Sequence, residues 1–260
     1  MPNPISIKPS DDGESNKTAG GGSNTTEKLE HARDVSTTVS MVESYLGQPF
    51  EYIFAVARPQ INVNFVGLYR GHFIFDLSNA PAGTILSADL CLYAYVADTG
   101  GTINNGHKFY IIGHDYGGDL NSATNDVNPT NNTTGDWTDT DVPTYSSEIT
   151  VNGVSAGDKI TVELNSTAIT EINNQVASGD FDIGLCTHYD YKDDFTLTPS
   201  IVDNQYNGVQ VGSSDHSDSS YHPVLELTYG GPTTGPIKIE EGAKIKISSG
   251  KLFVGLEAFR

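Results

Sequence analysis

Short runs rich in β-branched and aromatic residues recur along this chain of 260 residues, separated by clusters of Gly, Asn, Asp and Pro. This spacing is typical of strands joined by turns and predicts an all-β protein. Two packed sheets would let the strands bury one face each. The predicted strands are Phe50–Ala57, Ile61–Val66, Tyr69–Leu77, Ile85–Val96, Lys108–Gly113, Glu148–Val151, Lys159–Leu164, Phe181–Thr187, Phe195–Val202 and Pro223–Tyr229.

The predicted strand Ile85–Val96 shows a two-residue period, so its side chains are expected to alternate between the two faces of a sheet. The more apolar set should face the core. That set is Ala88, Leu90, Leu92 and Ala94, and the opposite set is Asp89, Cys91, Tyr93 and Tyr95.

One segment has a helical period instead. Ile169, Ile172 and Val176 recur at i, i+3 and i+7, after two residues suited to an N-cap and before Gly179, which suits a C-cap. We therefore expect one short helix at Ser166–Ala177, packed on the sandwich by a single apolar stripe.

Charge excludes several partners. Asp and Glu number 33 against 14 Lys and Arg, so the formal net charge is −19. Nucleic acids, polyanionic glycans and anionic membrane surfaces bind clustered basic residues, so none of them is expected as a partner.

No run of 18 apolar residues predicts a membrane span, and no secretory signal is visible at the start. Cys91 and Cys186 are expected as buried free thiols, with a disulfide between neighbouring strands as the alternative.

The stretch GGPTTGP, Gly230–Pro236, marks a boundary between a β-sandwich at 1–230 and a linker with a C-terminal β-arm at 231–260. Five basic and three acidic side chains give the arm a charge of +2, so the rest carries −21. Because so short a segment cannot bury its own core, we expect it to pair with a partner: in a homo-oligomer such as a trimer, or on a larger protein particle. A hairpin folded back on its own sandwich is the alternative. The attachment residues predicted from the alternation are Ile237, Ile239, Ile245, Ile247, Leu252 and Val254.

Three stretches carry a resemblance to a known family. YRGHFIFDLSNAPAGTILSADLCLYAYV (Tyr69–Val96), GDKITVELNSTAITEINNQVASGDFDIGLCTH and SSDHSDSSYHPVLELTYGG occur in that order. They resemble the opening hairpin, the strand–helix–strand unit and the closing strand of the DNRLRE (disaggregatase-related) domain family. The resemblance implies a jelly-roll-like two-sheet β-sandwich, similar to carbohydrate-binding modules. It also implies a place in extracellular polysaccharide-active proteins or on cell or virion surfaces.

Candidate binding residues fall in two groups. Tyr93, Tyr95 and Trp137 could stack on sugar rings, although tyrosines on an outer sheet face also serve cross-strand packing, and a lone Trp can plug the end of a sandwich. Asp190, Asp193 and Asp194 could hold a structural Ca²⁺, although acidic loop clusters are also commonly just solvated. No other cofactor is expected.

No sequence motif of a hydrolase, a phosphate-binding loop or a zinc protease is present, so we predict no catalytic residues and no enzyme activity. His114 and His188, each beside a Tyr–Asp or Asp–Tyr pair, are the nearest approach to a lyase-like site. The expected function is a structural or adhesion protein of a particle surface, with a phage virion favoured, as a capsid decoration or fibre protein. The alternative is an extracellular carbohydrate-binding module for a neutral glycan.

Overall fold

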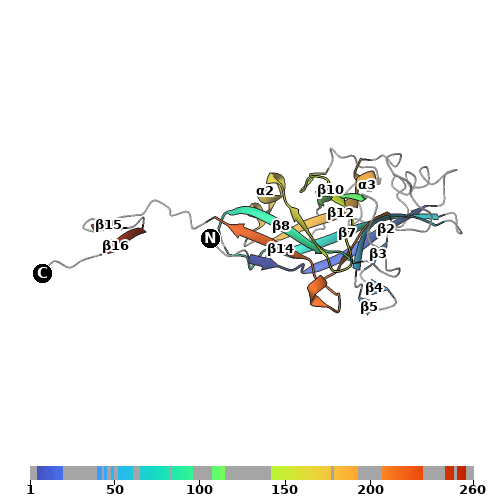
Figure 1. Cartoon of the computed structure of the whole chain (residues 1–260), viewed down its shortest axis with the longest axis horizontal. Coiled ribbons are helices and arrows are strands. Elements are labelled where there is room, and N and C mark those ends of the chain that lie inside the picture. The colour runs from blue at the N-terminus through green and yellow to red at the C-terminus, as the bar shows by residue number, and fades with distance from the viewer. Residues whose placement is uncertain are drawn as a thin grey trace. The chain divides into compact units, whose positions relative to one another are not determined.

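The computed structural model describes residues 5–19, 40–42, 44–45, 48–49, 52–60, 65–81, 83–95, 107–114, 142–176, 179–192, 207–230, 244–248 and 251–255. The chain divides into two compact units, Met1–Gly230 and Gly231–Arg260 (Figure 1). The described elements are β1 (Ile5–Ile7), β2 (Asp11–Ala19), β3 (Ser40–Val42), β4 (Ser44–Tyr45), β5 (Gln48–Pro49), β6 (Tyr52–Gln60), β7 (Phe65–Asp76), β8 (Ile85–Tyr93), β9 (His107–Gly113), β10 (Ile149–Val151), β11 (Lys159–Glu163), α2 (Ser166–Gln175), β12 (Asp180–Thr187), α3 (His188–Lys192), β13 (Asn207–Gly212), η3 (Ser219–Tyr221), β14 (Val224–Tyr229), β15 (Lys244–Ser248) and β16 (Lys251–Gly255).

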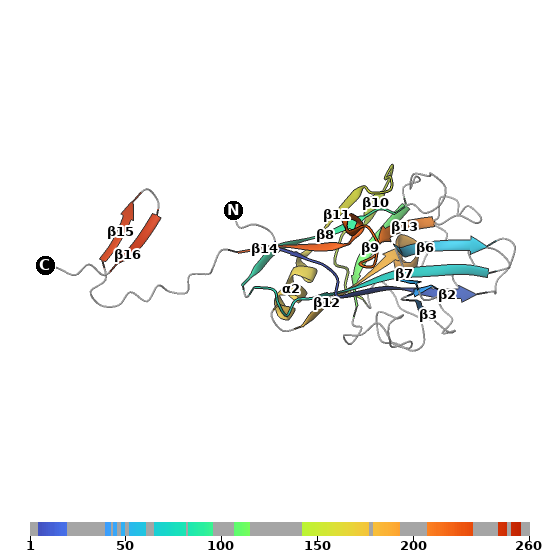
Figure 2. The same cartoon turned by 90° about the horizontal axis from the view of Figure 1, so that it is seen from below.

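The larger unit is an all-β sandwich of two antiparallel sheets, as predicted. The smaller sheet has the order β1-β14-β8-β11. The larger sheet has the order β10-β9-β12-β7-β2-β3, and β6 and β13 extend it beside β7. Figure 2 shows β6, β7 and β2 running side by side in this larger sheet. Within the described residues, all strand pairs of both sheets are antiparallel.

The core lies between the two sheets. The predicted core face of β8 is confirmed. All four positions of this set are buried, namely Ala88, Leu90 and Leu92 on β8 and Ala94 directly after it. Aromatic side chains of the larger sheet fill the opposite side, among them Phe73, Phe75, Phe109 and Phe181. The two cysteines are also buried, Cys91 on β8 and Cys186 on β12, and both are free thiols, so the free-thiol expectation is confirmed.

The predicted helix is α2, Ser166–Gln175. The Asn165 side chain caps its first turn by accepting hydrogen bonds from the backbone N–H groups of Thr167 and Ala168. Ala168 and Ile172 are buried, and α2 contacts β8 of one sheet and β12 of the other. The helix therefore closes one end of the sandwich. No helix among the described residues is long and apolar enough to cross a bilayer.

Several elements differ from the sequence-based expectation. β7 runs without a break from Phe65 to Asp76, where two strands were predicted, because β2 pairs with it through Gly67. The polar strand β2 and the five-residue helix α3 were not predicted. The predicted strand Phe195–Val202 lies outside the described residues.

The smaller unit contains an antiparallel hairpin of β15 and β16. Its register pairs Ile245 with Val254 and Ile247 with Leu252. Directly opposed positions lie on the same face of a ladder, so these four aliphatic positions share one face. The predicted attachment residues Ile237 and Ile239 lie outside the described residues.

Candidate functional site

The predicted sugar-stacking tyrosines lie near the end of β8, and both are half-buried. The ring of Tyr95 meets two other rings edge-on, His216 at 5.6 Å and Tyr221 at 6.3 Å between centroids. Tyr95 therefore packs within an aromatic cluster beside η3. The third predicted residue, Trp137, lies outside the described residues, and the stacking role of all three stays a prediction.

Asp190 is the one predicted calcium ligand that lies within the described residues. Its carboxylate receives two hydrogen bonds from the guanidinium of Arg70, at 2.6 Å and 2.8 Å, and both side chains are buried. This ion pair engages both carboxylate oxygens, which makes Asp190 a poor cation ligand. Asp193 and Asp194 lie outside the described residues. Within the described part of the chain, no three His, Cys, Asp or Glu side chains are grouped so that they could hold a metal ion.

A polar cluster missed by sequence reasoning surrounds Glu148, which precedes β10. Its carboxylate lies 2.5 Å from Lys108 Nζ and 2.5 Å from His188 Nδ1, and it accepts a hydrogen bond from the Tyr110 hydroxyl. Burial raises the pKa of Glu148, but the Lys108, His188 and Tyr110 contacts outweigh burial and hold that pKa below its usual range. Burial, and then Glu148, raise the pKa of Tyr110.

The same cluster is tightly packed. The Tyr110 ring packs against two other rings, His188 at 5.9 Å and Tyr191 at 4.3 Å between centroids. Because the Tyr110 proton is donated to Glu148, this phenol cannot act as a base. The cluster therefore resembles a structural network that joins α3 to β9 and the segment before β10.

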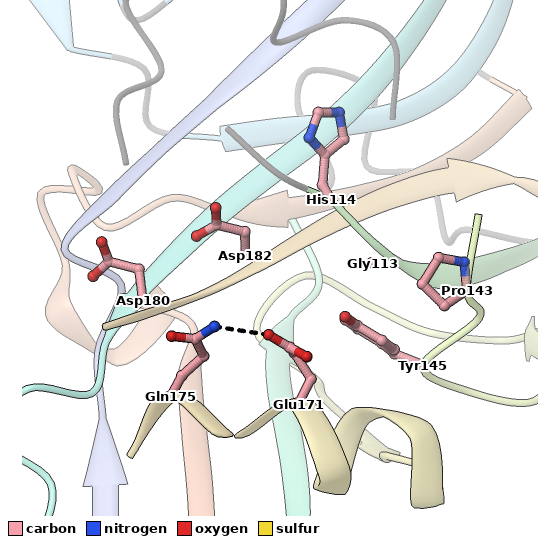
Figure 3. A pocket seen from close by; sticks show the side chains of 8 residues that line it. All are labelled: Gly113, His114, Pro143, Tyr145, Glu171, Gln175, Asp180 and Asp182. Atoms are coloured by element: carbon pink, nitrogen blue, oxygen red, sulfur yellow. Dashed lines mark hydrogen bonds between the residues drawn. The ribbon is translucent and has the colours of Figure 1, made fainter. Parts of the chain in front are cut away.

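An open cleft of about 380 Å³ lies elsewhere, where β9 and β12 meet the polar face of α2 (Figure 3). The segment that carries Pro143 and Tyr145 enters the cleft by pairing with β9: Gly113 N–H donates to Pro143 O, and Tyr145 N–H donates to Ile111 O, both at 2.8 Å. The cleft is lined by Gly113, His114, Pro143, Tyr145, Glu171, Gln175, Asp180 and Asp182.

Two elements supply the acidic side chains of this cleft. Glu171 and Gln175 lie one turn apart on α2, and the Gln175 amide donates to the Glu171 carboxylate at 2.8 Å. Asp180 and Asp182 lie two positions apart on β12 and therefore share one face of that strand. Figure 3 shows the hydroxyl of Tyr145 facing Glu171 across the hollow, while the ring of His114 points away from them.

Tyr145 is the most buried polar side chain of the cleft, at 6% exposure. Its ring stacks on Phe181 at 5.3 Å. No hydrogen bond of its hydroxyl is found among the described residues. Burial, and then the carboxylates of Glu171 and Asp182, raise the pKa of Tyr145 to about 12. The phenol is therefore protonated at neutral pH, and its O–H faces the cleft without an acceptor in the part of the chain that the structure describes.

A second hollow of about 360 Å³ adjoins the first along α2 and shares Pro143, Tyr145 and Glu171 with it. Its other lining residues are Ser166, Thr167 and Thr170. We call the two hollows together the α2 groove. Sequence reasoning missed this groove, although two signals pointed toward it. One is the long polar loop Gly113–Ser147, which holds Tyr145, and the other is the i, i+4 pair on the polar face of the helix.

No protein-family model matches the chain, and a search of curated proteins finds no significant match.

Proposed function

We propose that this chain is a structural or adhesion protein of a particle surface, with a phage virion as the particle. The observation that carries the proposal is the C-terminal hairpin, which forms a unit separate from the sandwich. The resemblance to a domain family found on virion and cell surfaces supports the choice of particle. In this proposal the sandwich is the displayed part and the hairpin is the attachment part.

The hairpin needs a partner because two strands of five residues are marginally stable in water. Ile245 and Ile247 pair in register with Val254 and Leu252 and form an apolar face. Burying these four side chains against a protein would contribute roughly 6 kcal/mol before ordering costs, at about 1.5 kcal/mol each. The outer edges of both strands pair with no other described strand, so their backbone donors and acceptors could pair with another chain.

Charge points to the same kind of contact. The unit Gly231–Arg260 carries +2 and the rest of the chain −21. An acidic protein surface, such as the sandwich of a second copy, is therefore an electrostatically favourable neighbour for the hairpin.

A pair of matched variants tests the proposal in the full chain. Replacing Ile245 and Ile247 with Ser removes the apolar face, whereas replacing Lys244 and Lys246 with Gln changes the alternate positions of the same strand. We expect the first variant to lose self-association, measured by analytical ultracentrifugation, and to lose co-sedimentation with particles purified from cells that express the tagged chain. The second variant should keep most of its self-association and most of its co-sedimentation with particles. A wild-type chain that is monomeric and never co-sediments with particles contradicts the proposal.

A second candidate function is carbohydrate recognition, and a different observation favours it. The α2 groove is open, elongated and lined by hydroxyl, amide and carboxylate groups, which are the groups that hydrogen-bond sugar hydroxyls. Binding of any oligosaccharide to the full chain, screened on a glycan array, tests this function.

A further inference from the structure

We propose that the α2 groove binds a glycan segment through an amino sugar whose amine is free and protonated. This inference rests on the second candidate function, carbohydrate recognition, and it names both a site and a class of ligand. The site is lined by described residues other than Tyr93 and Tyr95, which were the candidates predicted from the sequence.

The first argument is the Tyr145 hydroxyl. The side chain is 94% buried, its ring is held on Phe181, and its hydroxyl opens into the groove without a hydrogen-bond partner among the described residues. Because the ring is fixed against Phe181, the O–H is held in one position at the wall of the groove. A ligand oxygen in the groove would accept this hydrogen bond.

Space at this hydroxyl depends on a glycine. A Cβ at position 113 would lie 2.7 Å from both Cζ and the hydroxyl oxygen of Tyr145, and 2.8 Å from Pro143 Cγ. Any larger residue would therefore push the phenol out of place. Gly113 lets the end of β9 pass directly beside the phenol and leaves the hydroxyl at the wall of the groove.

The second argument is charge. Glu171 and Asp180 have no ion-pair partner among the described residues, although both line the groove. Burial, and then Asp76, which lies opposite on β7, raise the pKa of Asp180. Acidic side chains from both α2 and β12 therefore line the groove, and Glu171 and Asp180 form no ion pair within the described residues. A cationic ligand relieves this repulsion, and an acidic sugar adds to it.

The cation is organic rather than a metal ion. The carboxylates of the described part of the chain are not grouped closely enough to coordinate one metal together. An ammonium group needs only one or two acceptors within hydrogen-bond reach, and Glu171 lies at the centre of the groove, shared by both hollows.

The shape of the groove favours an oligomer. The two hollows have volumes of about 380 and 360 Å³ and continue along one face of α2. The second hollow adds Ser166 and Thr167 at the start of the helix. Hydroxyl groups of this kind suit the neighbouring units of the same sugar chain.

The test uses the full chain and four trimeric probes, measured by isothermal titration calorimetry at slightly acidic pH. The probes are a β-1,4 glucosamine trimer, its N-acetylated counterpart, a β-1,4 glucose trimer and trilysine. We expect the glucosamine trimer to bind at least tenfold more tightly than each of the other three. Trilysine carries the same charge without hydroxyls, so it measures non-specific attraction to an acidic protein.

Three variants locate the binding. Tyr145→Phe removes only the hydroxyl and should weaken glucosamine-trimer binding about tenfold. Glu171→Gln keeps the shape of the side chain and should weaken it at least tenfold. Glu163→Gln, on β11 and outside the groove, removes the same charge and should leave binding within about twofold. Circular dichroism of each variant checks that the fold is intact.

The outcomes separate the inference from the function on which it rests. Equal binding of the glucosamine trimer and trilysine, or equal losses in Glu171→Gln and Glu163→Gln, overturns the inference. Binding of the neutral trimers that Tyr145→Phe and Glu171→Gln leave unchanged overturns the groove as the site, while carbohydrate recognition stands. If none of the three sugar trimers binds, the inference is overturned. If the glycan array is also negative, carbohydrate recognition fails as well. The particle proposal is tested separately by the hairpin variants.

Discussion

Arg70 and Asp190, which are 120 positions apart in the sequence, form a buried two-point ion pair that joins β7 to α3. Arg70 Nε lies 2.6 Å from Asp190 Oδ2, and Nη2 lies 2.8 Å from Oδ1. The two side chains are 4% and 0% exposed. Removal of either side chain would take this counter-ion away from a buried charge, which is costly.

Removal of one partner should destabilise the sandwich strongly. We expect Arg70→Met to lower the free energy of unfolding by about 3–5 kcal/mol, because it leaves the Asp190 carboxylate buried without its counter-ion. The double variant Arg70→Met with Asp190→Asn should lose less free energy of unfolding than the two single variants lose in sum. Urea unfolding measures all three. A loss below about 1 kcal/mol in Arg70→Met would contradict this reading of the pair.

Asp12 should make stability depend on pH. Its carboxylate accepts a hydrogen bond from the backbone N–H of Ser214, yet burial outweighs that contact and raises the pKa from 3.8 to about 7. Between these two values the folded protein holds a proton that the unfolded chain has lost. The Asp12 contribution to the free energy of unfolding therefore falls as pH rises through this window, by at most about 1.4 kcal/mol per pH unit.

The variant Asp12→Asn isolates this effect. The difference in free energy of unfolding between Asp12→Asn and the wild type should shift in favour of the variant from pH 5 to pH 7.5. Other titrating groups largely cancel in this difference, among them His72, whose pKa burial and then Arg70 lower to about 3. Urea unfolding at the two pH values is the measurement, and a difference that does not change with pH would be inconsistent with a proton held on Asp12.

The N-cap of α2 should contribute to stability in two ways. Asn165 Oδ1 accepts from two backbone N–H groups of the first turn, and Asn165 Nδ2 donates to Thr144 O at 2.7 Å. Asn165→Ala removes all three contacts and should cost about 1–2 kcal/mol or more in thermal or urea unfolding. Asn165→Asp keeps the cap but loses the donor to Thr144, so it should cost less. An alanine variant as stable as the wild type would show that the cap is not needed.

A row of like charges crosses the smaller sheet. Asp89 on β8 lies directly opposite Glu163 on β11 and Glu226 on β14. Burial, and then these two carboxylates, raise the pKa of Asp89. Asp89→Asn should therefore stabilise the protein at pH 7 by about 0.5 kcal/mol at low salt, and the gain should shrink in 1 M NaCl. A loss of stability, or a gain that salt leaves unchanged, would contradict this prediction.

Local patterns were enough to predict β8 and α2. The buried set Ala88, Leu90, Leu92 and Ala94 follows the two-residue period of a strand. Asn165 and the spacing of Ile169 and Ile172 define the start and the packed face of the helix. These features depend on residues within one or two turns of one another, so the order of amino acids contains the information directly.

β2 and α3 depend on contacts that no local pattern reveals. β2, with the sequence DDGESNKTA, has no apolar alternation and is a strand because it pairs with β7 over nine residues. α3 is five residues long, too short to be stable alone, and it is held by Arg70 from β7.

The α2 groove also depends on contacts that no local sequence pattern reveals. Gly113, Tyr145, Glu171 and Asp180 come from four separate segments, and no one of these segments contains the site. They meet because β9 pairs on one side with β12 and on the other with the segment that carries Tyr145. The alternation and capping of single elements are local properties of the chain, whereas a binding groove needs side chains whose proximity arises only from strand pairing and helix packing.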